Sequence, residues 1–231
     1  MPSFDFSLLI SGHYHDLLVA GLQLSLTLLG VTLLLAVPLA VLVALMRLSG
    51  VWVWRSLAWC FVEFIRNVPL LAHMLFWYFG APELLPESVR EWLYQRNFEA
   101  VAAVIALTLY TAAYMSEDVR SGIRAISHVQ FEAGRALGFG YLATMRLIVL
   151  PQALRVTVPP LISQTLNLWK YTSLATVIGV AELMHQASKV ESETFRSLEA
   201  FVFATASYLI VSLLITALAS AYQRRFPARA I

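Results

Sequence analysis

Three charged side chains lie within long apolar stretches of this 231-residue sequence: Glu63, Arg66 and Lys170. A charge at the centre of a membrane-spanning helix costs about 2.5–3.5 kcal/mol on insertion scales, so a partner or a function must offset it. Catalysis inside a membrane would require paired ionisable residues on facing helices, and three such groups are few for that purpose. They are sufficient to line a polar path, and this is the chemistry that we expect of them.

The familiar catalytic and nucleotide-binding motifs are absent from the sequence. Neither of the two lysines, Lys170 and Lys189, lies in the GK[ST] of a phosphate-binding loop, and there is no GxSxG or HExxH. His13 and His15 lack a third metal ligand, and the single cysteine, Cys60, excludes a disulfide framework. We therefore expect no catalytic residue, no metal site and no cofactor bound by this chain.

The composition is that of a membrane protein. Hydrophobic residues make up 59% of the chain and charged residues only 13%, and the mean hydropathy is +0.72. A net charge of +2 is too small to suggest a nucleic-acid partner. The first sixteen residues contain no Lys or Arg, so we expect the amino terminus to be retained and not cleaved as a signal peptide.

Five stretches are apolar enough to cross the hydrocarbon core, which takes about 20 residues of helix. They are residues 17–46, 56–80, 98–115, 153–183 and 200–222. The sequence therefore predicts an all-α integral membrane protein with five transmembrane helices in one domain, residues 1–231. It also predicts a long loop, residues 116–152, between the third and fourth spans.

The distribution of basic residues predicts the orientation. With the carboxyl terminus inside, the cytoplasmic segments contain Arg47, Arg55, Arg120, Arg124, Arg135, Arg146, Arg224, Arg225 and Arg229. The outer segments then contain only Arg90, Arg96, Lys189 and Arg196. Because Lys and Arg concentrate on the cytoplasmic side, we expect the amino terminus outside and the carboxyl terminus inside. The loop 116–152 is then cytoplasmic.

Residues 132–151, EAGRALGFGYLATMRLIVLP, are the most structured part of this loop. They predict a short helix, a break at Gly138 and a second helix interrupted at Pro151. Leu137, Phe139 and Tyr141 would form an apolar knob rimmed by arginine, which is typical of a docking surface.

This segment resembles the cytoplasmic coupling loop of binding-protein-dependent ABC importers, in which E-A-x-x-x-x-G is followed by nine residues and I-x-L-P. Gly134 stands where alanine is usual. The resemblance implies a contact with a separate ATPase for Gln130, Glu132, Ala133, Gly134, Gly138, Ile148, Leu150 and Pro151.

Four further blocks resemble the polar amino acid permease subfamily, so the likeness covers most of residues 17–223. They are GLQLSLTLLG (21–30), FIRNVPLLAHMLFWYFG (64–80), YTAAYMSEDVRSGI (110–123) and LWKYTSLATVIGVAEL (168–183). The resemblance implies a multi-pass permease of a type I ABC importer in the bacterial inner membrane. Its implied partners are a second permease, identical or homologous, two ATP-binding subunits that hold ATP and Mg²⁺, a periplasmic solute-binding protein and an amino acid.

Polar residues interrupt two of the expected spans, and transporters often place solute sites at such interruptions. The expected path consists of Glu63, Arg66, Asn67, Pro69, Tyr114, Lys170, Tyr171, Thr172 and Ser173. Arg66 could instead snorkel or pair with Glu63, three residues earlier on the same helix face. Thr172 and Ser173 could instead bond carbonyls of their own helix.

Tyr171 bears on the substrate, since the family that the chain resembles commonly has an acidic residue after this lysine. Without that carboxylate, and beside Lys170, we expect an acidic or neutral polar amino acid as the solute. Lys170 could also point to a helix carbonyl or to Glu182.

The leading prediction is the permease subunit of an ATP-driven amino acid importer. The alternative is an ion-gradient-driven secondary carrier or channel. That alternative would require a relay of embedded acidic residues, for which only Glu63 is available, and it leaves the long loop unexplained.

Overall fold

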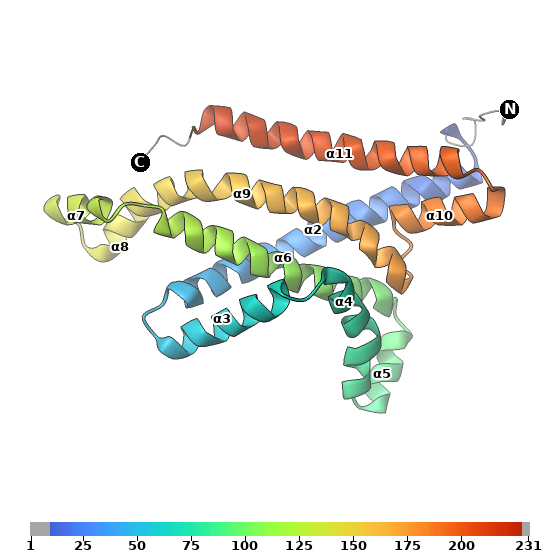
Figure 1. Cartoon of the computed structure of the whole chain (residues 1–231), viewed down its shortest axis with the longest axis horizontal. Helices are drawn as coiled ribbons and strands as arrows, with labels where there is room; N and C mark the ends of the chain where they lie inside the picture. Colours follow the sequence, from blue (N-terminus) through green and yellow to red (C-terminus); the bar gives the residue numbers. More distant parts are fainter. Residues whose placement is uncertain (1–9, 228–231) are drawn as a thin grey trace.

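The computed structural model describes residues 10–227, and within this range the chain is helical and contains no strand. Four helices are long and apolar enough to cross a membrane, or five if a sharply bent pair counts as one span. Figure 1 shows the long helices lying alongside one another. The predicted all-α architecture with five spans is confirmed.

The first span, α2 (His13–Leu48), packs along α6 (Phe98–Arg124) through small side chains. Ala36 and Ala40 of α2 form a buried cluster with Ala112 and Met115 of α6. Small residues one turn apart allow two helix backbones to approach closely, which is how membrane helices associate without a hydrophobic driving force.

The second span is broken, as the polar residues predicted. Helix α3 (Trp52–Arg66) and helix α4 (Leu70–Leu75) meet at an angle of 102°. Pro69 disfavours helical backbone at the residue before it, so α3 cannot run on into α4. A π-helical turn, η1 (Phe76–Gly80), a 3₁₀ turn, η2 (Ala81–Leu84), and a short helix, α5 (Glu87–Tyr94), follow α4.

The third span is longer than predicted, and the prediction of a loop from residue 116 is wrong. Helix α6 continues to Arg124 because its polar last turns pack against neighbouring helices. Gly122 is buried, and a Cβ there would lie 1.9 Å from Thr157 Oγ1. Glu117 and Arg120, one turn apart, form an ion pair along the helix.

The fourth span is one continuous helical segment, residues 141–178. It comprises α8 (Tyr141–Thr144), the π-helical turn η3 (Met145–Val149), α9 (Leu150–Tyr171) and the 3₁₀ turn η4 (Thr172–Ile178). The predicted interruption at Pro151 is therefore wrong, and the expected break around Lys170 is only a change from α-helix to 3₁₀-helix at Thr172. The span also ends before residue 183, because Gly179 turns the chain with a φ of 88°.

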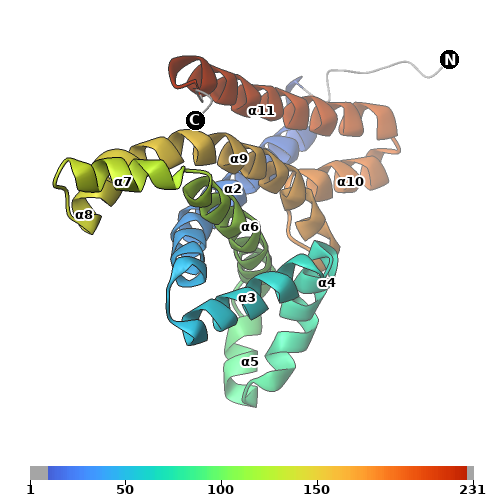
Figure 2. The ribbon, with the colours of Figure 1, turned by 60° about the vertical axis from the view of Figure 1, so that its left-hand side comes forward.

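Helix α10 (Leu183–Thr194) and the last span, α11 (Ser197–Arg225), complete the described chain. The α2–α3 turn, α8, the carboxyl end and helix α7 (His128–Ala136) gather at one end of the bundle, and the amino end and α10 lie at the other (Figure 1). Figure 2 shows the same division from a second direction. The two termini therefore lie at opposite ends of the bundle, as an odd number of spans requires.

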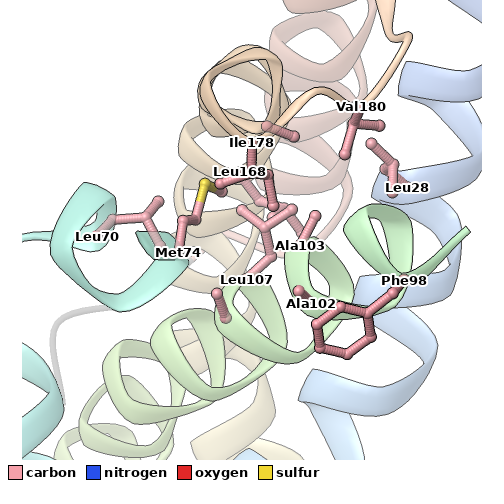
Figure 3. Packing of buried hydrophobic residues seen from close by; sticks show 12 residues of the cluster. Leu28, Leu70, Met74, Phe98, Ala102, Ala103, Leu107, Leu168, Ile178 and Val180 are labelled. Carbon is pink, nitrogen blue, oxygen red and sulfur yellow. The ribbon is translucent and has the colours of Figure 1, made fainter. Parts of the chain in front are cut away.

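The largest buried cluster lies where the broken span meets α6 and α9 (Figure 3). Met74 of α4, Leu107 of α6 and Leu168 of α9 are each at most 1% exposed. This cluster fixes the break in the second span against the middle of the bundle. The break is thus held in place by buried packing and is not a frayed helix end.

Candidate functional site

The predicted short helix and glycine break form α7 and its C-terminal turn. Ser127 caps the amino end, where its Oγ accepts a hydrogen bond from Val129 N–H at 3.3 Å. At the other end, Phe139 N–H donates to Gly134 O at 3.0 Å and Gly138 N–H donates to Arg135 O at 2.9 Å. This pair of bonds is a Schellman motif, which requires a left-handed residue at its centre. Gly138, with a φ of 78°, meets that requirement.

Gly134, the departure from the usual alanine, has a packing explanation. It is buried, and α7 folds back so that Gly134 faces Thr144 of α8. A Cβ at this position would lie 2.6 Å from both Oγ1 and Cγ2 of Thr144. The glycine therefore allows the two helices to approach more closely than an alanine would.

Helix α7 is tied to the ends of two spans. Phe131 of α7 packs against a cluster of Ile126, Val149 and Ala153, which joins the end of α6 to the start of α9. Gln130 Oε1 accepts a hydrogen bond from Gln152 Nε2 at 3.2 Å, and the same amide donates to Ile148 O at 2.9 Å. The bond between Gln130 and Gln152 thus fastens α7 to α9, whereas the bond to Ile148 lies within the fourth span.

The remaining residues of the predicted coupling set face outward. Glu132 and Ala133 are exposed, and Glu132 Oε1 lies 3.3 Å from His128 Nδ1. Leu150 and Pro151 are exposed at the start of α9. The apolar knob is exposed as predicted, with Leu137 at 69% and Tyr141 at 71%.

A cavity of about 470 Å³ lies beside this exposed surface. Its lining residues come from α7 and α8 and are His128, Phe131, Arg135, Tyr141 and Thr144. A groove with apolar and basic walls next to an exposed apolar knob is a surface suited to another protein.

A smaller cavity, of about 110 Å³, lies between α6 and α9. It is lined by Tyr110, Thr111, Tyr114, Gln164, Asn167, Leu168 and Tyr171. The Tyr110 hydroxyl donates to the Tyr114 hydroxyl at 3.4 Å, and the rings of Tyr110 and Tyr171 meet edge to face at 5.8 Å. The walls thus offer hydroxyl and amide groups, which can both donate hydrogen bonds to a polar solute and accept them from it.

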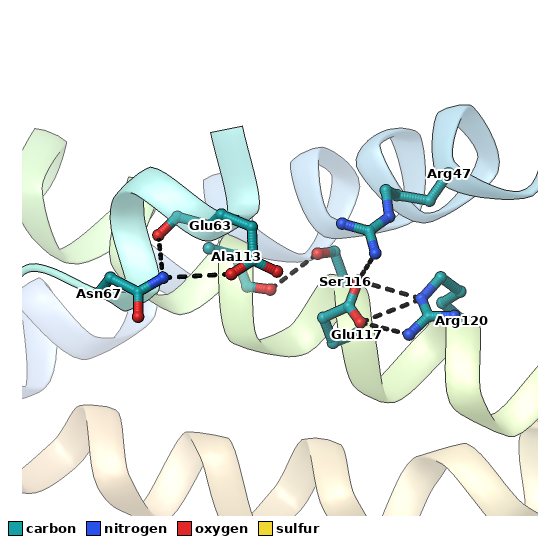
Figure 4. A network of polar contacts seen from close by, with 7 residues as sticks. All are labelled: Arg47, Glu63, Asn67, Ala113, Ser116, Glu117 and Arg120. Carbon is teal, nitrogen blue, oxygen red and sulfur yellow. Dashed lines mark hydrogen bonds and ion pairs between the residues drawn. The ribbon is translucent and has the colours of Figure 1, made fainter. Parts of the chain in front are cut away.

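The break in the second span brings a cation to this cavity. The guanidinium carbon of Arg66 lies 5.0 Å from the centre of the Tyr114 ring. Arg66 is exposed, and a cation over an aromatic face is stabilised by the ring electrons, which helps to hold its side chain against α6. Glu63 instead accepts two hydrogen bonds from Asn67 Nδ2, at 3.1 Å to the Glu63 Oε2 and at 2.7 Å to the Glu63 backbone oxygen (Figure 4). Within residues 10–227, Arg66 and Glu63 form no ion pair.

Tyr114 and Tyr171 line this cavity, whereas the other seven residues of the predicted path are not part of the lining, including three in the fourth span. Thr172 Oγ1 donates to Trp169 O at 2.8 Å, and Ser173 Oγ donates to Lys170 O at 2.7 Å. These are contacts within their own helical segment. The side chain of Lys170 is exposed, and its ammonium group has no hydrogen bond or ion pair with any residue that the structure describes.

Glu182, considered above as a partner for Lys170, is fully buried and bound elsewhere. Its carboxylate accepts bonds from the backbone N–H of Met184 and His185, and so caps α10. It also accepts from Ser25 Oγ at 3.1 Å and from the Tyr208 hydroxyl at 3.0 Å. This carboxylate therefore joins α2, α10 and α11.

The structure thus brings Tyr114, Tyr171 and Arg66 together, with Asn67 and Pro69 forming the bend beside them. The sequence analysis did not include several lining residues in the path: Tyr110, Thr111, Gln164 and Asn167. It also missed Asp118 of α6, a half-buried carboxylate that interacts electrostatically with Arg66. The spacing of the residues on the fourth span could have revealed this lining, because Gln164, Asn167 and Tyr171 lie on one face of a helix.

Comparison with known proteins agrees with this geometry. Residues 22–229 match the family described as binding-protein-dependent transport system inner membrane component. The chain is 37% identical to the probable glutamine ABC transporter permease protein GlnM of Bacillus subtilis, over 90% of this chain and 88% of that one. It is 31% identical to the glutamate/aspartate import permease protein GltK of Escherichia coli O6:H1, over 97% and 99%.

A solved structure has the same fold. The crystal structure of an amino acid ABC transporter with histidines superposes with a TM-score of 0.84 at 30% identity, and the match covers 96% of this chain and 99% of that chain. The match extends over nearly all of both chains. The chain belongs to the binding-protein-dependent transport system inner membrane component family, as an amino acid ABC transporter permease that crosses the bacterial inner membrane several times.

Proposed function

We propose that this permease carries an acidic or neutral polar amino acid through the cavity between α6 and α9, and that an ATPase subunit docked on α7 drives the movement. The observation that carries the proposal is the position of Arg66. This cation sits at a broken span and stacks on Tyr114, a residue of the cavity wall. A fixed cation beside hydroxyl and amide groups suits the carboxylate that every amino acid carries.

The cavity itself supports the choice of solute. Tyr171, which replaces the acidic residue common in the family, is part of the lining, and the lining contains no carboxylate. A cationic side chain would therefore find no direct counter-ion in the wall. Among the relatives, GlnM is named for glutamine and GltK for glutamate and aspartate.

The volume of the cavity implies that it must open during transport. At about 110 Å³ it is smaller than the roughly 300–1,000 Å³ of pockets that enclose small ligands. Widening requires α6 and α9 to move apart, and the 102° break between α3 and the segment Leu70–Leu84, next to Arg66, is an available hinge.

The coupling segment supports an external source of energy. The exposed face of α7, with Glu132 and Ala133, and the knob of Leu137 and Tyr141 offer a contact surface that no other residue within 10–227 covers. ATP and Mg²⁺ would be bound by the partner, since this chain has no phosphate-binding loop. The proposed assembly contains two ATP-binding subunits, a second permease and a periplasmic solute-binding protein.

The test is uptake by the reconstituted complex, with competition among amino acids. Glutamine, glutamate or aspartate should compete with the labelled substrate, and uptake should require ATP inside the vesicles. Preferential transport of arginine or lysine would refute the substrate class. Uptake by the chain alone, driven by an ion gradient without ATP, would refute the coupling to an ATPase.

A further inference from the structure

A third cavity, of about 230 Å³, lies at the end of the bundle that carries the α2–α3 turn. Its lining comes from three helices and consists of Arg47 of α2, Arg55, Ser56 and Trp59 of α3, and Arg120 and Arg124 of α6. Four guanidinium groups thus converge on one cavity from elements far apart in the sequence. We refer to these six residues as the arginine pocket.

The charges of the arginine pocket are only partly compensated (Figure 4). Glu117 is the one carboxylate within 4.0 Å of any of its arginines among the described residues, at 3.5 Å from Arg47 and 2.5 Å from Arg120. One carboxylate against four guanidinium groups leaves three positive charges in excess. Neither Arg55 nor Arg124 has an ion pair within residues 10–227.

One of these groups also lacks an acceptor. Arg47 Nη1 is buried and has no hydrogen-bond partner among the described residues. An unpaired buried donor is unfavourable, and the penalty is greater when the group is charged. The arginine pocket is therefore short of acceptor oxygens as well as of negative charge.

The surroundings place the arginine pocket at the level of the lipid headgroups. Helix α3 displays exposed tryptophans next to it, with Trp52 at 68%, Trp54 at 52% and Trp59 at 52%. Tryptophan concentrates at the interface between membrane and water. Trp59 is both exposed and part of the lining, so the cavity borders the surface that faces lipid.

We propose that the arginine pocket binds the phosphate group of an anionic phospholipid. Arginine presents a planar fork of donors that matches phosphate oxygens, and Ser56 adds a hydroxyl donor. The acyl chains would lie along the tryptophan-bearing face of α3. A lipid held in this way would link α2, α3 and α6, and α3 is the helix that leads to the break beside the solute cavity. This site is separate from the proposed solute path and from the α7 surface.

Brominated lipids, which quench nearby tryptophan fluorescence, give a direct test on the permease complex in nanodiscs. Brominated phosphatidylglycerol should quench at a lower mole fraction than brominated phosphatidylcholine. Trp59→Phe should lower this excess, because Trp59 lines the cavity, whereas Trp52 and Trp54 on the same helix are not part of the lining. Each basic residue near an anionic surface contributes about a fivefold gain in binding. The double variant Arg55→Gln/Arg124→Gln should therefore weaken the selective component about 25-fold.

The matched control is Arg224→Gln/Arg225→Gln. It removes two arginines from the last turn of α11, and these residues are not part of the arginine pocket. The control lowers the basic charge of the chain equally, and it should retain the phosphatidylglycerol preference because neither residue lines the arginine pocket. If both double variants lost the phosphatidylglycerol preference equally, general surface charge would explain the preference, and the proposal would be overturned.

Two further outcomes would also overturn it. Equal quenching by the two brominated lipids would show that the cavity does not select an anionic headgroup. Complete competition by inorganic phosphate at millimolar concentration would identify a soluble anion as the occupant. If Arg55→Gln/Arg124→Gln fails to assemble, the comparison of Trp59→Phe with the unchanged chain still decides between these results.

Discussion

Gly134→Ala is predicted to harm this chain, although alanine is usual at this position in the permeases that it resembles. Gly134 of α7 faces Thr144 of α8. An added Cβ would lie 2.6 Å from Oγ1 and Cγ2 of Thr144 and 3.1 Å from its Cβ. Thr144 is only 2% exposed, so its side chain has little room to turn away.

The size of the effect follows from this overlap. Forcing an extra carbon into a well-packed site costs about 1–3 kcal/mol. Movement of α7 away from α8 would relieve the strain, and that movement would displace the surface proposed for the ATPase. If the whole strain appeared in docking, the affinity for the ATPase would fall about tenfold for each 1.4 kcal/mol.

The assay measures ATPase co-purification and uptake in the same preparation. Thr144→Ala removes the two atoms that would lie 2.6 Å from the added Cβ. The double variant Gly134→Ala/Thr144→Ala should therefore lose about 1 kcal/mol less docking free energy than the sum of the two single variants. Gly140→Ala is the control, because Gly140 has an ordinary φ of −70° and no atom within 4 Å of an added Cβ. Normal docking and uptake by Gly134→Ala would refute the packing explanation.

Three further predictions concern the turn, the cavity and the orientation. Gly138→Ala should weaken ATPase co-purification, because a side chain at a φ of 78° costs about 1–2 kcal/mol; docking unchanged relative to the Gly140 control would contradict this. Arg66→Met should raise the apparent KM for the amino acid about tenfold or more while the complex still assembles, whereas Lys170→Met, outside the cavity, should leave the KM unchanged; the reverse pattern in uptake kinetics would move the site to Lys170. Ser127→Cys in a Cys60→Ser background should react with an impermeant thiol reagent only from the cytoplasmic side, and labelling of intact spheroplasts would refute the orientation.

The ends of the spans were the part of the fold that the sequence predicted least well. Five of the six residues 116–121 are polar or charged, and the exception is Val119. Such a composition is typical of a loop between spans. In the structure they continue α6, because Gly122 meets Thr157 and Glu117 meets Arg47 and Arg120. Hydropathy predicts the part of a helix that lies in hydrocarbon, and it carries no information on how far the helix extends beyond.

The prediction that a proline interrupts the helix was correct at Pro69 and wrong at Pro151, and the local hydrogen bonds explain the difference. Pro69 follows a polar turn at which Asn67 bonds the backbone oxygen of Glu63, and the chain bends by 102°. Pro151 lies at the start of α9, after a π-helical turn in which Leu150 N–H donates to Met145 O. That turn shifts the hydrogen-bond ladder by one residue just before the proline, so the helical segment continues.

The solute cavity could be predicted only in part, because its walls come from two helices that lie far apart in the sequence. The sequence identified Arg66 by its charge, and Tyr114 and Tyr171 by their positions near interrupted spans. It did not reveal which face of α9 points to α6, so Gln164 and Asn167 were missed while the neighbouring Lys170, Thr172 and Ser173 were included. Residues that follow one another along a helix point in different directions, about 100° apart. Only the packing of α9 against α6 selects the face that lines the cavity, and that face contains Asn167 and Tyr171, four residues apart, and excludes Lys170 between them.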